Sequence, residues 1–197
     1  MKTAIQIALA LVIVILGYLI FESVMEPVRF NQETARREAR IIQRLKDIRQ
    51  VQLAHRARYN RFNTDLDSLV SFIKTDSLPV IRAIGSVPDT LTEAEAVNLG
   101  IVQRDTIWIQ AIDSLLRSAR YPVDSLPYVP FTDGKRFDMD AGHIERGLVK
   151  LPVFEATAWP QHFMRDVDRW RVYYTRDLEV GLKVGSMFEA STDGNWE

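Results

Sequence analysis

The sequence has no cysteine, and it contains only nine glycines, eight prolines and three histidines. The absence of cysteine excludes disulfides, thiolate metal sites and a thiol nucleophile. It does not identify the compartment, because a reducing cytosol and an oxidising periplasm both tolerate such a chain. An excess of charge is also absent, since 25 basic and 26 acidic residues give a net charge of −1. Global charge therefore favours no acidic substrate, and we expect no nucleic-acid partner.

Motifs of the common enzyme classes are absent as well. The sequence contains no G-x-S-x-G, no P-loop, no G-x-G-x-x-G and no H-E-x-x-H. Its serines stand in no recognisable nucleophile context. Catalytic residues can lie far apart in a sequence, so an unrecognised enzyme stays open as an alternative. We predict a non-enzymatic protein that uses no cofactor.

Charged side chains are missing between Lys2 and Glu22. The 19 residues from Thr3 to Phe21 are almost entirely apolar. As a helix they span about 28 Å, close to the thickness of a bilayer's hydrocarbon core. Backbone amides in lipid must bond within their own segment, so such a stretch has to be helical there. The sequence therefore predicts a transmembrane anchor from Thr3 to Phe21, with the lipid bilayer as one partner.

The orientation of this anchor follows from the flanking residues. A cleavable signal peptide is the rival interpretation, but the apolar run is long for one and no A-x-A-like cleavage site follows it. The short N-terminus with Lys2 favours an N-terminus in the cytoplasm. A positive-inside argument points the other way, because arginines soon follow the anchor, at Arg29, Arg36, Arg37 and Arg40. We expect a single-pass protein of a bacterial inner membrane with its domain in the periplasm.

A long helix is predicted beyond the anchor. Pro27 indicates a break or kink, and residues 30–59 contain no glycine and no proline. Ile41, Leu45 and Ile48 recur at helical spacing on an otherwise strongly basic segment. This stripe either packs on the chain's own domain or contacts partner subunits. A third interpretation places the basic surface on anionic lipid headgroups.

The remaining sequence predicts helices first and strands later. A second helix is expected from a cap at Asn63 or Thr64 to about Lys74. A short helix from the capping box at Thr92 to Gly100 lies between strands over 80–87 and 105–112. Further strands are expected over 128–131, 136–140, 143–145, 148–157, 171–175 and 182–184. This order predicts an α+β fold with an antiparallel sheet. We divide the chain into an anchor (1–28), a helical stalk (29–75) and a soluble domain (76–197).

An apolar helix, an amphipathic helix and a small sheet domain follow one another in this chain. The segment IRQVQLAHRARYNRFNTDLDSLVSFI leaves the long helix after Tyr59. Over residues 1–75 this layout resembles type IV pilin-like proteins and pseudopilins, which implies a subunit of a cell-envelope assembly. The chain departs from their leader and early-glutamate pattern, because Gly17 lies inside the apolar run and Glu22 lies beyond it. The layout is also similar to that of other single-pass bacterial envelope proteins, which implies no activity.

Five residues are candidates for binding. Asp138 and Asp140 alternate on a predicted strand, so both carboxylates share one face, and His143 follows closely. These three are weak candidates for a cation site, and a solvated strand face is the alternative. Trp159 and Trp196 are candidate partner contacts, because tryptophan is enriched at interaction hot spots.

Two functional hypotheses therefore stand beside that of an unrecognised enzyme. The leading hypothesis is a subunit of an envelope assembly that contacts other membrane or envelope proteins, further copies of itself included. Ile41, Leu45 and Ile48 would join the two tryptophans as its contact positions. The second hypothesis is a membrane-tethered domain that binds a small ligand or a cation.

Overall fold

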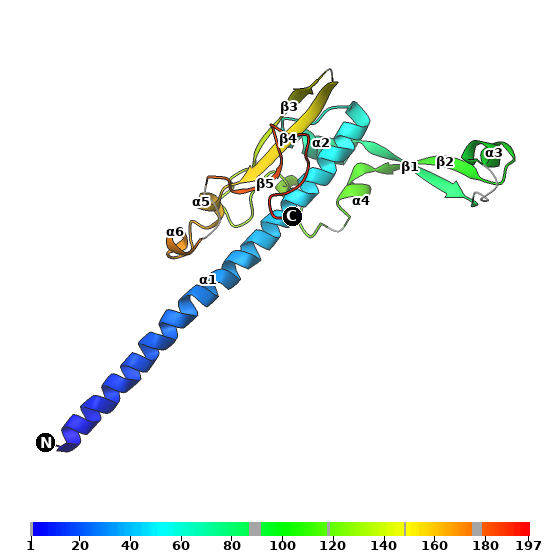
Figure 1. Cartoon of the computed structure of the whole chain (residues 1–197). Helices are drawn as coiled ribbons and strands as arrows, with labels where there is room; N and C mark the ends of the chain where they lie inside the picture. The colour runs from blue at the N-terminus through cyan, green and yellow to red at the C-terminus, as the bar shows by residue number, and fades with distance from the viewer. Residues whose placement is uncertain (1, 87–91, 118, 148, 175–178) are drawn as a thin grey trace.

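One long helix organises the molecule. In the computed structural model, which describes residues 2–86, 92–117, 119–147, 149–174 and 179–197, α1 runs from Lys2 to Tyr59. Side chains from Ile5 to Phe21 are exposed along its free half, and a small domain surrounds its other half (Figure 1). Within the described residues, α1 is the one helix long and apolar enough to cross a membrane. The predicted α+β fold is confirmed.

The predicted break at Pro27 is wrong, because α1 continues through this residue. Proline lacks the amide hydrogen that would bond the carbonyl of Ser23, and its ring crowds that turn. The flanking residues are good helix formers, and residues 30–59 on the C-terminal side contain neither glycine nor proline. One lost hydrogen bond in a helix of 58 residues therefore does not end it.

The core forms where α1 meets the domain. The stripe of Ile41, Leu45, Ile48 and Val51 is completely buried. Opposite it lie apolar side chains of α2 and of the three-stranded sheet; they include Leu69, Ile73, Phe154, Leu182 and Val184. The stripe therefore packs on the chain's own domain, the first of the interpretations given above.

Helix α2 (Leu66–Thr75) folds back beside the end of α1. Leu66, Leu69 and Ile73 are buried as its spacing predicts. The predicted cap at Asn63 or Thr64 is wrong, because Asp65 accepts the hydrogen bond from the Ser68 amide at 2.9 Å. Asn63 Oδ1 instead accepts from the Asp65 amide at 3.0 Å and so shapes the approach to the cap.

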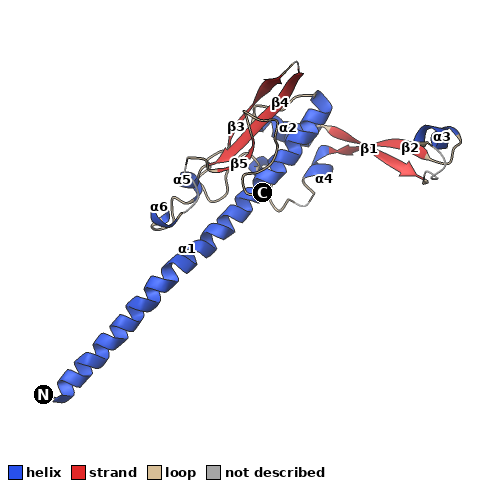
Figure 2. Ribbon diagram, in the orientation of Figure 1, coloured by secondary structure: helices blue, strands red, loops and turns tan. Residues whose placement is uncertain are grey.

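The main sheet is antiparallel with the strand order β3–β4–β5 (Figure 2). Its strands are β3 (Asp138–Arg146), β4 (Val149–Ala158) and β5 (Leu182–Gly185). The C-terminal tail lies along β5, where Gly194 forms an isolated bridge with Val184. Short helices link the other elements: α4 (Ala111–Leu115), a 3₁₀ turn (Val123–Ser125) and α5 (Pro160–Phe163).

Several predicted strands have other structures. The segment 171–175 is wrong as a strand, because Trp170–Tyr173 form the helical turn α6. Arg169 there adopts a left-handed conformation (φ 51°) that directs the chain into this turn. The segment 128–131 reduces to one bridge between Tyr128 and Arg136. The expected strand ends at residues 87, 148 and 175 lie outside the described residues.

A two-stranded ribbon leaves the body of the domain. Strands β1 (Ser77–Ile84) and β2 (Gln103–Gln110) pair antiparallel over their full length. The short helix α3 (Glu93–Asn98) lies at the far end, where the Thr92–Glu95 capping box forms as predicted. Figure 1 shows this ribbon extending away from α1 and from the main sheet. We call residues 77–86 and 92–110 the arm.

Candidate interaction surface

The arm carries apolar side chains that are exposed to solvent. Paired residues on antiparallel strands share a face, and Val80 pairs with Ile107 while Ile84 follows on the same side. Ile84 is 50% exposed, and Val80 and Ile107 are also exposed. Trp108 is 55% exposed on the opposite face. On the face of Val80 and Ile84, Arg82 pairs with Asp105 between them. An isolated two-stranded ribbon is at best marginally stable in water, so exposed apolar side chains on one make it a candidate interaction surface.

The end of the arm adds to this surface. Gly85 ends β1 with φ 98°, and a side chain there would meet the Ile101 carbonyl oxygen at 2.3 Å. Only glycine therefore suits this close turn. Leu99 and Ile101 are exposed beside it, whereas Ala96 is buried under the turn.

The base of the arm is attached to the end of α1. The Tyr59 hydroxyl donates to Asp76 Oδ2 at 2.6 Å, immediately before β1. The Ala111 amide donates to the Asp76 carbonyl at 2.9 Å and so joins both strands at the base. The Arg58 guanidinium lies 5.2 Å from the centre of the Trp108 ring. These contacts fix the direction in which the arm leaves the helix.

The length of α1 separates the arm from the anchor. Phe21 and Tyr59 are 38 residues apart, which places them about 57 Å apart along a helix. The headgroup layer on one side of a bilayer is only about 5–8 Å thick. A bilayer that holds the anchor and lies perpendicular to α1 therefore does not reach the arm.

The stalk positions predicted as partner contacts have another role. Ile41, Leu45 and Ile48 are completely buried in this chain's own core, which corrects their assignment to a partner surface. Trp196 is half-buried and packs against the same core. The Trp159 indole nitrogen donates to Asp138 Oδ2, so both tryptophans make contacts within the chain.

The candidate cation ligands do not converge. Asp138 and Asp140 share one face of β3. His143 lies on the other face, because it is three residues beyond Asp140 and side chains alternate along a strand. Asp140 Oδ1 accepts from the Ala141 amide at 2.8 Å. Across the described ranges, no group of three or more histidine, aspartate or glutamate side chains is placed to hold a metal ion.

Arginines on the basic face of α1 bind loops of the same domain. Arg37 is buried, with 8% of its side chain exposed, and it donates to both carboxylate oxygens of Asp166 at 2.5 and 2.8 Å. It also donates to the Phe163 carbonyl at 2.6 Å. The hydrogen bond to Asp166 raises the pKa of Arg37, and the same bond lowers the pKa of Asp166. A basic residue that looks solvated in the sequence is thus a structural clamp.

Two further arginines act in the same way. Arg44 lies 3.5 Å from the centre of the Tyr121 ring and donates to the Ser125 carbonyl, and its burial lowers its pKa. Burial raises the pKa of Tyr121, whose hydroxyl also donates to Asp47 Oδ2 at 2.5 Å. Arg49 binds Glu197 at 2.9 Å and so holds the C-terminal tail.

A cavity of about 470 Å³ lies between the start of α2 and the sheet. Arg61, Thr64, Ser68 and His143 bring polar groups to it, and Phe62 lines it as well. His55 forms its inner wall, where Nδ1 lies 2.9 Å from the Arg61 carbonyl. The guanidinium, imidazole and hydroxyl groups suit a small anionic ligand better than a cation.

The arm and the arginine clamps were missed in the sequence. Alternation in DTIWIQ indicated a strand, but nothing local shows that its apolar face lies uncovered. The clamps join residues that are 81 to 148 positions apart, which spacing does not reveal. A comparison of the chain with protein-family models, curated proteins and solved structures finds no significant match.

Proposed function

We propose that the protein is a non-enzymatic subunit of a bacterial cell-envelope assembly, held in the inner membrane by its anchor and joined to its partner through the arm. The observation that carries this proposal is the exposed apolar face of Val80, Ile84 and Ile107 on a ribbon that projects from the body. The anchor restricts the chain to a membrane plane, and α1 holds the arm at a fixed height above it. This arrangement suits contact between neighbouring membrane proteins, further copies of this chain included.

The mass of the native complex tests the proposal. Full-length protein would be extracted from its host membranes in mild detergent and measured by light scattering. The chain weighs 22.7 kDa, so a protein mass well above this value is expected after the detergent is subtracted. Ile84→Asp combined with Ile107→Asp should return it to a single chain, because both changes place charge in a buried contact. Val149→Asp, on an exposed apolar residue of the body, is the matched control.

A wild-type chain that is strictly monomeric in this measurement would overturn the proposal. So would a complex that both aspartate variants leave intact, because the arm would then not be the contact.

The periplasmic orientation is part of the same proposal. A tag at Glu197, next to Arg49 on the domain side of α1, reports the side on which the domain lies. Protease should remove the tag in intact spheroplasts. Protection until lysis would place the domain in the cytoplasm, as the arginines after the anchor favour, and would remove the pilin-like interpretation.

The cavity beside α2 favours a second candidate function, the binding of a small carboxylate or phosphate. Arg61 and His143 supply the charge and hydrogen bonds that such a ligand needs. Thermal unfolding of the full-length protein with added phosphate or dicarboxylates would show a rise in midpoint that Arg61→Gln abolishes. An equal response in the variant would exclude this site.

A further inference from the structure

We propose that the segment from Arg169 to Tyr173 rests on the headgroup layer of an anionic bilayer beside the anchor. This inference depends on the membrane anchoring proposed above. It assigns a lipid contact to a part of the domain that is distinct from the arm and distinct from the transmembrane helix.

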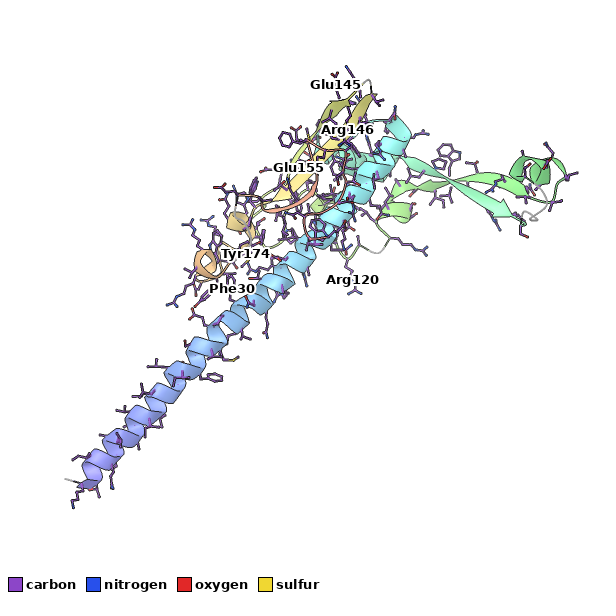
Figure 3. The ribbon with its side chains drawn as sticks, viewed as in Figure 1. Phe30, Arg120, Glu145, Arg146, Glu155 and Tyr174 are labelled. Carbon is purple, nitrogen blue, oxygen red and sulfur yellow. The ribbon has the colours of Figure 1, made fainter. Side chains whose placement is uncertain are left out.

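The height of this segment is fixed by two contacts with α1. Arg169 forms an ion pair with Glu26 at 3.0 Å, and the rings of Tyr173 and Phe30 lie 5.5 Å apart. Glu26 is five residues beyond Phe21, which is about 8 Å along the helix. Phe30 is nine residues beyond Phe21, which is about 14 Å, so the two contacts lie within and just above a headgroup layer of about 5–8 Å. Figure 1 shows α6 as the labelled element of the domain nearest to the anchor, and Figure 3 shows Phe30 and Tyr174 beside it.

The side chains of the segment suit a membrane interface. Val172 is 76% exposed, although it is apolar and lies in a one-turn helix on the surface. Trp170 and Tyr173 are partly buried beside it. Tryptophan and tyrosine gather at membrane–water interfaces because each has an apolar ring and a polar group. At such an interface, the exposed Val172 side chain can insert into the apolar acyl chains of the lipid.

The charges of the segment favour an anionic surface. Three nearby acids are each paired with an arginine: Glu22 with Arg29, Glu26 with Arg169 and Asp166 with Arg37. Arg171 follows, with Asp168 as the neighbouring acid. The Arg171 guanidinium lies 5.4 Å from the centre of the Trp170 ring, so the two meet lipid together. One arginine near an anionic surface contributes about 1 kcal/mol to lipid binding.

Quenching of tryptophan fluorescence tests this contact. The full-length chain would be reconstituted in phosphatidylcholine vesicles with a phosphatidylglycerol fraction and a lipid that carries a nitroxide on its headgroup. Trp170→Phe should reduce the quenched part of the fluorescence by about half, since tryptophans at an interface are those within reach of the headgroups. Trp108→Phe is the matched control, because the arm lies far above the bilayer and this change should leave the quenching unchanged.

A second variant tests the charge. Arg171→Gln should weaken quenching in vesicles that contain phosphatidylglycerol and should have little effect in pure phosphatidylcholine. Vesicle flotation separates the failures. A chain that does not float with the vesicles contradicts the membrane anchoring itself. A chain that floats, but whose quenching is the same with and without Trp170, overturns the lipid contact alone.

Discussion

Arg37 shows how a single side chain attaches the domain to the helix. Its guanidinium binds Glu33 on its own helix and also reaches Asp166 and the Phe163 carbonyl, more than 120 residues away. A planar guanidinium serves two carboxylate oxygens at once, which a lysine ammonium does not. The loop that continues into α6 is therefore tied to α1 at Arg37.

Replacing this arginine should destabilise the domain. Arg37→Gln leaves the Phe163 carbonyl and Asp166 without their donor, so we expect a loss of about 1.5–3 kcal/mol in the free energy of unfolding. Arg36→Gln is the control on the adjacent residue, whose side chain is 62% exposed and whose ion pair is worth about 0–1 kcal/mol. Denaturant unfolding of the detergent-solubilised chain measures both. Equal losses would contradict the clamp.

The same pair predicts a pH dependence. Arg37 lowers the pKa of Asp166 in the folded chain, whereas aspartates of the unfolded chain have a pKa of about 3.9. The folded chain therefore binds fewer protons at this site than the unfolded chain does. The contribution of this pair is therefore present above about pH 4 and is lost as the pH falls through the folded-state pKa. We expect the stability difference between wild type and Arg37→Gln to shrink below pH 4. A difference that stays constant down to pH 2 would disprove it.

The cap of α2 gives two adjacent residues, Thr64 and Asp65, different expected effects on stability. Asp65→Ala removes the side chain that accepts from Ser68 and should cost about 1 kcal/mol. The Ser68 hydrogen bond lowers the pKa of Asp65, so this carboxylate stays charged at neutral pH. Thr64→Ala should be nearly neutral because Thr64 does not cap the helix. Thermal unfolding of the two variants decides between Asp65 and Thr64, which was one of the two caps, with Asn63, that the sequence predicted.

At the scale of elements, α1 is the one that the others depend on. Its N-terminal part is exposed and apolar. Between residues 37 and 51 it carries both the clamps and, on another face, the buried stripe that forms the core. The spacing of Ile41, Leu45 and Ile48 was enough to predict that stripe. Its burial against the chain's own domain needed the fold, since an apolar stripe looks the same whichever surface covers it.

The continuity of α1 gives a distance to measure. The chain has no cysteine, so Phe21→Cys and Ala39→Cys accept spin labels without any background. Eighteen residues of unbroken helix separate these backbone positions by about 27 Å. Electron–electron resonance should give one narrow distribution around this separation, and Pro27→Ala should leave it unchanged. A broad or clearly shorter distribution would show that the helix breaks at Pro27.

The short elements show where sequence patterns are informative. Capping chemistry acts over three residues, so the helix after Thr92 was predicted together with its capping box. The alternation in β2 was also visible. The segment 171–175 looked like a strand because β-branched and aromatic residues fit both a strand and an exposed helical turn. Its conformation depends on Arg169 and on contacts with α1, which no local pattern contains.

At the scale of the whole molecule, two surfaces lie at different heights along one helix. Glu26, which pairs with Arg169, is about 8 Å from the end of the anchor, and the arm begins about 57 Å from it. Layout and fold class were accessible from the sequence because hydrophobic runs and periodicity determine them. The candidate surfaces were not, because exposure of an apolar face is a property of the assembled domain.

The central claim is that the arm meets a partner protein, and site-specific photo-crosslinking in native membranes tests it most directly. A photoreactive residue would replace Val80, on the same face of the arm as Ile84 and Ile107, or, as the control, Val149 on the body. We expect one adduct of defined mass from position 80, its loss when Ile84→Asp and Ile107→Asp are added, and no such adduct from position 149. No adduct from position 80, or the same adducts from both positions, would contradict the account.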